Sequence, residues 1–294
     1  MPKNFPITEI TKGSTQYPSA LKHIHDAPGR LYCRGNRDLL RSDCFGVVGT
    51  RKLTPYGRAV TEQIVRELVG HGLTIVSGLA MGIDAVAHRA TLDAGGATIA
   101  VLGSGADDRT IAPQTNSVLA QDILKHGGCI VSEYPAGTEA KDFTFPERNR
   151  IISGLSKGVL VVEADVRSGA LITAHLALEH NRDVFAVPGG IFSAKSIGTN
   201  RLIQQGAKLI TSAQDILDEY GQAGPQARLK GMVSTRDPLE EKILGILDAS
   251  GPTFVDTVIR QCQEPAQRVS ATLAVLEIRG AIQNIGNGTY RVKK

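Results

Sequence analysis

Arginines gather around one apolar run in residues 145–174, FPERNRIISGLSKGVLVVEADVRSGALITA. Arg148 and Arg150 precede the run VLVV, and Arg167 follows it. Guanidinium groups offer several N–H donors in a planar arrangement that suits phosphate and carboxylate oxygens. The stretch predicts a helix, a buried strand and a second helix. The pattern therefore favours a site that binds a negatively charged ligand.

The elements that would position these arginines repeat one unit from residue 45 onward: a short apolar run, a loop rich in Gly and Ser, and an amphipathic helix. Continuous apolar runs that alternate with helices are typical of a parallel sheet covered on both faces. The sequence therefore predicts an α/β fold with a doubly wound, Rossmann-like parallel sheet. The predicted strands occupy residues 45–49, 73–78, 97–103, 128–134, 158–164, 183–189 and 207–210.

Composition divides the 294 residues into one large domain, one small domain and two connecting parts. Residues 1–44 predict an extension with a short helix and a strand, packed on the edge of the sheet domain of residues 45–220. Residues 221–236 are rich in Gly, Pro and Gln and predict a linker. Residues 237–294 predict a small winged-helix domain, because three amphipathic helices precede a hairpin with an Asn-Gly turn.

Glycines follow the predicted strands at the edge where their carboxyl ends meet, and a doubly wound sheet binds its ligands there. Gly49 follows the first strand and Gly78 the second. Small residues let a ligand approach the backbone, and helix starts offer unpaired N–H groups to an anion. Each glycine alone could merely form a tight turn, and each arginine could be a solvated surface residue. Four arginines at one edge favour a phosphate-bearing ligand: Arg51, Arg148, Arg150 and Arg167.

The common nucleotide motifs do not occur, and no cofactor is predicted. GVVGTRKLTPYG is not G-x-G-x-x-G, the second strand ends at Ser77 instead of an acidic residue, and no G-x-x-x-x-G-K-[ST] exists. Asp84 and His88 lie four residues apart and could form an acid–base pair. A structural role is favoured, with Asp84 bonded to backbone amides, because no nucleophile stands beside them in the sequence.

Histidines and cysteines suggest no metal site. His23 and His25 are two residues apart, but no carboxylate or thiol cluster joins them. The four cysteines are scattered and predict reduced thiols. The start MPKNFPITEITKG lacks the apolar run of a signal peptide, and no run of about 18 apolar residues occurs. We expect a cytoplasmic protein without membrane contact.

Positive charge is unevenly distributed along the chain. Residues 237–294 carry 7 Lys and Arg against 7 Asp and Glu, whereas residues 1–236 carry 26 against 22. The whole net charge of +4 therefore lies in residues 1–236. DNA-reading modules are usually basic. The neutral winged helix is therefore expected to contact protein or to serve as an accessory module.

Three stretches resemble the DNA processing protein A family, also called DprA or Smf: SGLAMGIDAVAHRATLDAGGATIAVLGSG, the long run from SEYPAG to FAVPGG, and GTNRLIQQGAKLI. The similarity spans about residues 14 to 217, and RNRIISGLSKG and SGALITA are its most specific blocks. The tail resembles the winged helix of the family. The resemblance implies a homodimer that binds and protects incoming single-stranded DNA and loads the RecA recombinase in natural transformation, without catalysis.

The resemblance also implies the site. Arg51 would contact a backbone phosphate, and the run 148–150 would build a DNA pocket with Ser168 and Gly169. Gln114 departs from the family, which commonly carries a basic residue there, and Arg109 or Lys195 could compensate. The predicted DNA contacts are Arg51, Lys52, Gly78, Arg109, Gln114, Arg148, Asn149, Arg150, Arg167, Ser168 and Gly169.

The alternative is a nucleotide-binding protein or an enzyme of the lysine-decarboxylase-like phosphoribohydrolases, which cleave nucleoside monophosphates with an arginine and a glutamate beside a P-G-G-x-G-T loop. Pro188-Gly189-Gly190 resembles part of that loop but follows a later strand. The catalytic carboxylates would fall near Ile172 and Thr173, which cannot act as a general acid or base.

Overall fold

The computed structural model describes residues 5–221, 238–278, 281–286 and 288–292. The chain forms two compact units, Met1–Gly224 and Pro225–Lys294. None of the described helices is both long enough and apolar enough to cross a membrane. The residues of the predicted linker after Gly221 lie outside the described ranges.

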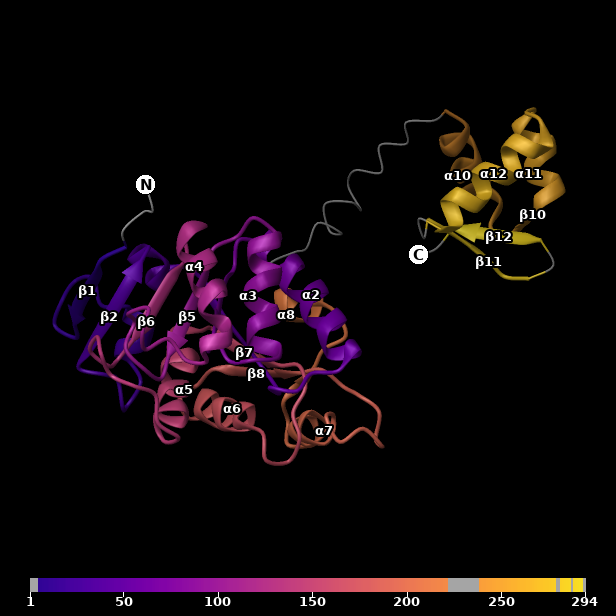
Figure 1. Cartoon of the computed structure of the whole chain (residues 1–294). Coiled ribbons are helices and arrows are strands. Elements are labelled where there is room, and N and C mark those ends of the chain that lie inside the picture. The colour runs from indigo at the N-terminus through magenta and orange to yellow at the C-terminus, as the bar shows by residue number, and fades with distance from the viewer. Residues whose placement is uncertain (1–4, 222–237, 279–280, 287, 293–294) are drawn as a thin grey trace. The chain divides into compact units, whose positions relative to one another are not determined.

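A nine-stranded sheet forms the centre of the larger unit, in the order β1-β2-β6-β5-β4-β3-β7-β8-β9 (Figure 1). The strands from β3 to β9 pair in parallel, as the sequence predicts, and all seven predicted strands are confirmed. The strands are β1 Ile7–Thr11, β2 Arg30–Gly35, β3 Cys44–Val48, β4 Thr74–Ser77, β5 Thr98–Leu102, β6 Cys129–Ser132, β7 Gly158–Val161, β8 Asp183–Ala186 and β9 Lys208–Leu209.

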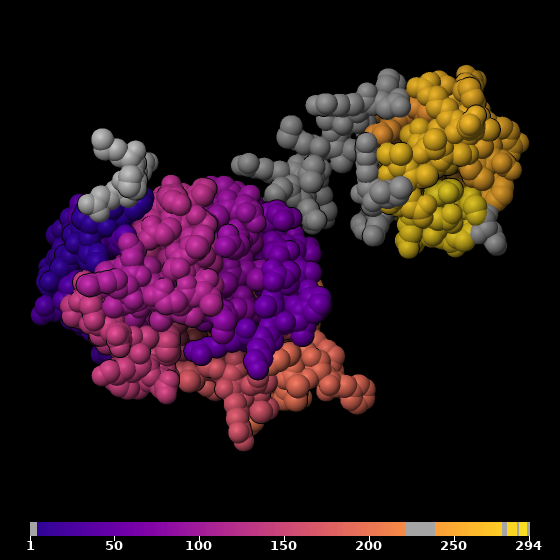
Figure 2. All heavy atoms as spheres, in the orientation of Figure 1, coloured from indigo at the N-terminus to yellow at the C-terminus, as the bar shows by residue number. Residues whose placement is uncertain are grey.

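The amino-terminal segment extends this sheet at one edge. β2 pairs antiparallel with β6, and β1 pairs antiparallel with β2. The sequence predicts one strand here, but not β1, in which Ile10 alone is fully buried. The space-filling view shows this indigo segment covering one end of the larger unit (Figure 2).

Helices cover both faces of the sheet because successive strand residues alternate between two apolar cores. In β7, Val159 and Val161 pack with the core of α1, α5 and α6, whereas Leu160 packs with the core of α2, α3 and α8. Figure 1 shows α4 on the side of α2 and α3, and α7 on the side of α6. The helices are α1 Ser19–Lys22, α2 Pro55–Gly70, α3 Ile83–Asp93, α4 Ser117–Lys125, α5 Thr144–Leu155, α6 Gly169–Glu179, α7 Ile197–Gln204 and α8 Ala213–Glu219, with short 3-10 helices η1 Arg37–Arg41 and η2 Gln114–Asn116.

The strand order creates a topological switch point between β3 and β7. From β3 the chain continues through β4, β5 and β6 on one side, and then returns to the other side of β3 as β7. The loops that leave β3 and β7 therefore turn to opposite faces of the sheet. In doubly wound folds such a divergence opens a crevice in which ligands bind.

In the described part of the smaller unit, three helices pack with a three-stranded sheet, which confirms the predicted winged-helix architecture. Its sheet has the order β10-β12-β11, and β11 and β12 pair antiparallel as the wing hairpin. Asn287, predicted in the hairpin turn, lies outside the described residues. Ile243, Val258 and Leu273, one from each helix, are buried together. The elements are α10 Pro238–Ser250, β10 Thr253–Phe254, α11 Val255–Cys262, α12 Ala266–Ile278, β11 Ile282–Asn284 and β12 Thr289–Val292.

Candidate functional site

A cavity of about 640 Å³ lies at the switch point, and we call it the switch-point cavity. Its walls come from the loops that follow β3 and β7 and from the first turns of α5 and α6. The predicted DNA contacts that line it are Arg51, Lys52, Arg148, Asn149, Arg167, Ser168 and Gly169.

Arg51 is held at the cavity by the backbone of its own loop. The Thr50 amide donates to the Glu163 carbonyl oxygen at 2.8 Å, and the Thr50 carbonyl oxygen accepts from the Ile83 amide at 3.2 Å. The guanidinium carbon of Arg51 lies 5.3 Å from the ring centroid of Phe145, a cation–π distance. The ring therefore supports one face of the guanidinium at the cavity.

Glu163 ties the loop after β3 to the end of β7. Its buried carboxylate accepts from the Thr54 amide at 3.0 Å and from the Thr54 hydroxyl at 2.5 Å. Thr54 is the N-cap of α2, and its hydroxyl oxygen also accepts from the Gly57 amide. A Cβ on Gly57 would overlap the carboxylate, so glycine is needed for this approach. The sequence shows Glu163 at a strand end without revealing this bond.

Arg148 lines the cavity although its side chain is almost entirely buried. Its Nη1 donates to the Val101 carbonyl oxygen at 2.6 Å. A Cβ on Gly78 would overlap the guanidinium, so Gly78 supplies space for Arg148 and does not line the cavity. Burial lowers the pKa of Arg148 to about 10, which leaves it charged at neutral pH. Its Nε has no hydrogen-bond partner among the described residues.

Asp84 and His88 have the structural contacts that were favoured from the sequence. Asp84 accepts from the Gly78 amide at 3.0 Å and from the Ala80 amide at 3.4 Å. Burial raises the pKa of Asp84, and the charge of Arg148 opposes that shift. His88 is fully buried, with Nδ1 at 2.8 Å from the Thr98 hydroxyl. Asp84 therefore fixes the loop after β4, which lies against the guanidinium of Arg148.

The start of α6 contributes backbone N–H groups to the opposite wall. Ser168 is the N-cap and accepts from the Ala170 amide at 3.3 Å. Asn149 donates to the Gly169 carbonyl oxygen at 3.4 Å, which links α5 to this turn. The amides of Ala170 and Leu171 are bonded to Ser168, and the dipole of the eleven-residue helix makes its start favourable for an anion. The wall therefore suits a phosphate group.

Positive charge exceeds negative charge around the cavity. The residues that line the cavity include five cations and three carboxylates. Lys195, from the loop after β8, is paired with Asp165 at 3.2 Å. Arg51, Lys52 and Arg167 form no ion pair with any described residue. The cations are Arg51, Lys52, Arg148, Arg167 and Lys195, and the carboxylates are Asp84, Asp142 and Asp165. The cavity can therefore hold an anion with unpaired guanidinium and ammonium groups.

The expectation that Arg150 meets the other three arginines is wrong. Arg150 donates from Nη2 to both Glu133 carboxylate oxygens at 2.7 and 2.8 Å, and its Nε lies 3.3 Å from Asp26. It lines a second cavity of about 610 Å³. Residues two apart on a helix do not face the same way, so Arg148 and Arg150 leave α5 in different directions.

Arg109 and Gln114 also lie away from the switch-point cavity. Both follow β5, which is separated from β3 by β4. Gln114 donates to the Arg109 carbonyl oxygen at 3.1 Å, and the Arg109 side chain is exposed. Of the two cations considered as compensation for Gln114, Lys195 lines the cavity and Arg109 does not.

A cluster that sequence reasoning missed lies beside Arg150. The sequence predicts no carboxylate cluster around His25, but the structure brings His25, Asp26 and His180 together. His180 is far from the other two in the sequence, so no spacing rule could connect them. His23 does not belong to this cluster.

The fold and the site define a doubly wound α/β protein with a cationic crevice at its switch point and a winged-helix module. The chain belongs to the DNA recombination-mediator protein A family, whose sequence model matches residues 8–221. The DprA winged helix domain matches residues 230–288. The resemblance stated from the sequence is confirmed.

Relatives are similar over most of the chain. Protein Smf of Escherichia coli is 41% identical over an aligned length of 294 residues. The alignment covers 97% of this chain and 77% of that protein. DNA processing protein DprA of Streptococcus pneumoniae is 48% identical over 204 residues, covering 69% and 71%.

Two solved structures share the fold. DprA from Streptococcus pneumoniae has a TM-score of 0.68 at 45% identity and covers 74% of this chain and 75% of its own. DNA processing protein A from Helicobacter pylori, described as having a unique single-stranded DNA binding mode, has a TM-score of 0.66 at 32% identity and covers 75% and 98%.

Proposed function

We propose that this protein binds the sugar-phosphate chain of single-stranded DNA in the switch-point cavity and acts as a recombination mediator without catalysis. The observation that carries the proposal is the meeting of Arg51, Arg148 and Arg167 at one cavity that is lined by the start of α6. The family and the described DNA binding of the Helicobacter pylori protein support single-stranded DNA as the ligand.

Phosphate contacts should dominate this binding. Aromatic residues make up 4% of the chain, and Phe145, which lines the cavity, already supports Arg51. Base stacking on aromatic platforms is the usual second source of affinity in single-strand binders. With few such platforms, affinity should depend steeply on salt and little on base sequence.

The test measures fluorescence anisotropy of a labelled oligothymidylate over a range of salt concentrations. Arg51→Gln and Arg167→Gln should each weaken binding and lower the slope of log affinity against log salt by about 0.7. Arg58→Gln is the matched control, because Arg58 is exposed on α2, pairs with Glu62 and does not line the cavity. Unchanged affinity and slope in both cavity variants would contradict the proposal.

Arg150→Gln tests which of the two cavities binds DNA, because Arg150 lines only the second one. Because Glu133 and Asp26 already neutralise its guanidinium, the loss of Arg150 should change the salt slope less than the loss of Arg51. A larger change than in Arg51→Gln would move the DNA site to the second cavity.

The absence of catalysis is testable with nucleoside monophosphates. Ile172 and Thr173, at the positions where a phosphoribohydrolase would carry its carboxylates, both line the switch-point cavity. Neither can act as a general acid or base. The purified protein should release no free base, and sustained release that disappears in Arg148→Gln would favour the hydrolase.

We propose further that the protein protects incoming DNA, loads RecA onto it in natural transformation, works as a homodimer and acts in the cytoplasm. Family membership supports the first three, and the four buried free cysteines suit a reducing compartment. Light scattering should give twice the mass of one chain. RecA should coat protein-covered single strands faster when this protein is present, and an unchanged rate would remove the loading role.

A further inference from the structure

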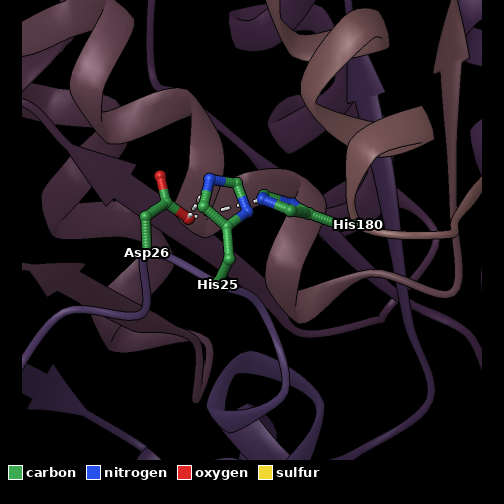
Figure 3. Close-up of side chains that lie close together, drawn as sticks. All are labelled: His25, Asp26 and His180. Atoms are coloured by element: carbon green, nitrogen blue, oxygen red, sulfur yellow. Dashed lines mark ion pairs between the residues drawn. The ribbon is translucent and has the colours of Figure 1, made fainter.

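Three potential metal ligands converge between the amino-terminal segment and the end of α6 (Figure 3). His25 and Asp26 lie between α1 and β2, and His180 is the C-cap of α6. Asp26 Oδ1 is 3.4 Å from His180 Nε2 and 4.0 Å from His25 Nε2. One ligand atom from each of the three residues lies within 4.8 Å of the others.

The buried part of this cluster has unused ligand atoms. The His180 side chain is 0% exposed, and neither its Nε2 nor Asp26 Oδ1 has a hydrogen-bond partner among the described residues. Buried polar atoms in proteins are nearly always paired. The two atoms face each other at 3.4 Å, a separation that either a proton on Nε2 or a metal ion can bridge.

Ser153 can hold His180 in the tautomer that binds a cation. His180 Nδ1 lies 3.0 Å from the Ser153 hydroxyl, and this oxygen lies 3.3 and 3.4 Å from the carbonyl oxygens of Arg150 and Asn149. When the hydroxyl proton goes to a carbonyl, the hydroxyl oxygen can accept from Nδ1–H, and the tautomer that leaves the Nε2 lone pair facing the carboxylate oxygen is then the one that a metal ion requires. Two facing acceptors repel each other unless a cation lies between them.

We propose that His25, Asp26 and His180 bind one zinc ion, with Ser153 orienting His180 through its second nitrogen. Zinc takes imidazole nitrogen and carboxylate oxygen at about 2.0–2.2 Å in tetrahedral geometry, which separates neighbouring ligand atoms by about 3.4 Å. The pair of Asp26 and His180 already has this separation. The exposed His25 side chain closes the remaining gap by rotation, and the fourth position is open to water.

The surrounding charges leave one carboxylate oxygen for the metal. Arg150 contacts Asp26 through Oδ2 and the backbone oxygen, and its charge is offset by Glu133. Arg182 donates to the carbonyl oxygens of Ala20 and Gly154. The carboxyl end of α6 adds a negative potential where His180 stands. The ion would tie the segment after α1 to α5 and α6.

The experiment uses the full chain without a purification tag, stripped with a chelator and titrated with zinc chloride in a calorimeter. The wild type should bind one zinc ion per chain, and His25→Ala should weaken binding at least about tenfold, since even outer partners of ligands contribute 10–100-fold. His25 is exposed, so this variant should keep the fold, which circular dichroism checks. His23→Ala is the matched control and should bind like the wild type.

Cobalt substitution identifies the ligand atoms. Cobalt bound at this site should show d–d absorption without thiolate charge transfer. A thiolate band would assign the ion to Cys33 and Cys129, whose sulfur atoms are 3.0 Å apart, and would overturn the proposal. Absence of stoichiometric zinc binding, or equal affinity in His25→Ala and the wild type, would overturn it as well.

Discussion

At the residue scale, the position of Arg148 depends on a missing side chain. Gly78 leaves the space that the guanidinium occupies, so Gly78→Ala must displace Arg148 or the loop after β4. Overpacking of this kind usually lowers the free energy of unfolding by about 1–3 kcal/mol. We expect that loss in urea unfolding, together with weaker binding of single-stranded DNA.

Gly70→Ala is the control for this substitution. Gly70 is the last residue of α2, and a Cβ there would meet nothing within 4 Å. It should leave DNA affinity unchanged and change stability by less than about 1 kcal/mol, in the stabilising direction. Equal stability and affinity in Gly78→Ala and the wild type would show that the Arg148 side chain can adopt another position without loss.

His88 should give the fold a pH dependence. Its ordinary pKa is 6.5, and burial, aided by the charge of Arg148, lowers it to about 3 in the folded chain. Between these values the unfolded chain binds a proton that the folded chain does not. The stability from His88 is therefore complete above pH 6.5 and is lost toward pH 3, by about 1.4 kcal/mol per pH unit.

Urea unfolding between pH 6.5 and about pH 5 checks this contribution, because most carboxylates titrate at lower pH. His88→Asn keeps a polar group near Thr98 and should flatten the pH dependence. His126→Asn, at an exposed position, should keep the slope of the wild type. An identical slope in all three proteins would show that His88 is not protonated on unfolding in this range.

The sequence predicts which side chains lie close together where a strand-end rule applies. Arg51 and Arg167 lie in the loops that follow β3 and β7, which are neighbouring parallel strands, so the topology brings these loops to one edge. Arg150 was misplaced because its direction depends on the rotation of α5, which no strand end determines. The cluster of His25, Asp26 and His180 could not be predicted, since a buried contact between distant segments leaves no local pattern.

At the element scale, one carboxylate holds two elements at the switch point. Glu163→Gln removes the charge that the Thr54 amide and hydroxyl share, so the start of α2 should loosen from the end of β7. Hydrogen bonds to charged groups contribute about 1.5–3 kcal/mol. We expect a loss of up to that size in urea unfolding, and faster hydrogen exchange at the Thr54 amide.

The exposed Glu62 provides the comparison, because its ion pair with Arg58 is at the surface of α2. Surface pairs contribute about 0–1 kcal/mol. Glu62→Gln should therefore change neither stability nor exchange at Thr54 appreciably. Unaltered exchange at Thr54 in Glu163→Gln would show that the N-cap, and not the carboxylate, holds the start of α2.

Elements buried on both faces were predictable, and elements at the edge were less so. The strands from β3 to β7 are buried at every residue, which few other structures require, whereas β8 begins with an exposed residue and β9 is exposed. β1 has a single buried residue, so its sequence differs little from that of a loop. The strand order and the antiparallel pairing of β2 arise from packing between distant segments and have no signature in any one run.

At the scale of the whole molecule, the charge distribution favours the larger unit as the site of the proposed DNA binding. The tail carries 7 basic and 7 acidic residues, and the rest of the chain carries the excess of 26 over 22. A chain that ends at Gly221 should therefore bind oligothymidylate within about threefold of the full chain and with the same salt slope, as measured by anisotropy. A melting transition like that of the full chain's larger unit is the control for folding.

A tenfold or greater loss on truncation would show that the winged helix contacts DNA despite its neutral charge. Full DNA affinity of the truncated chain would favour contacts with other proteins as the role of the winged helix. The size of the salt slope separates a lost phosphate contact from a loss of folded protein, which would lower the active fraction without changing the slope.

The two walls of the switch-point cavity are made at different times during translation. One wall comes from residues 48–84 and the other from residues 142–195. An unfinished chain on the ribosome carries the first wall, but the second is complete only after Lys195 has been added and β7 has paired with β3. If the proposed DNA site is this cavity, incomplete copies that end before the second wall should not bind DNA there.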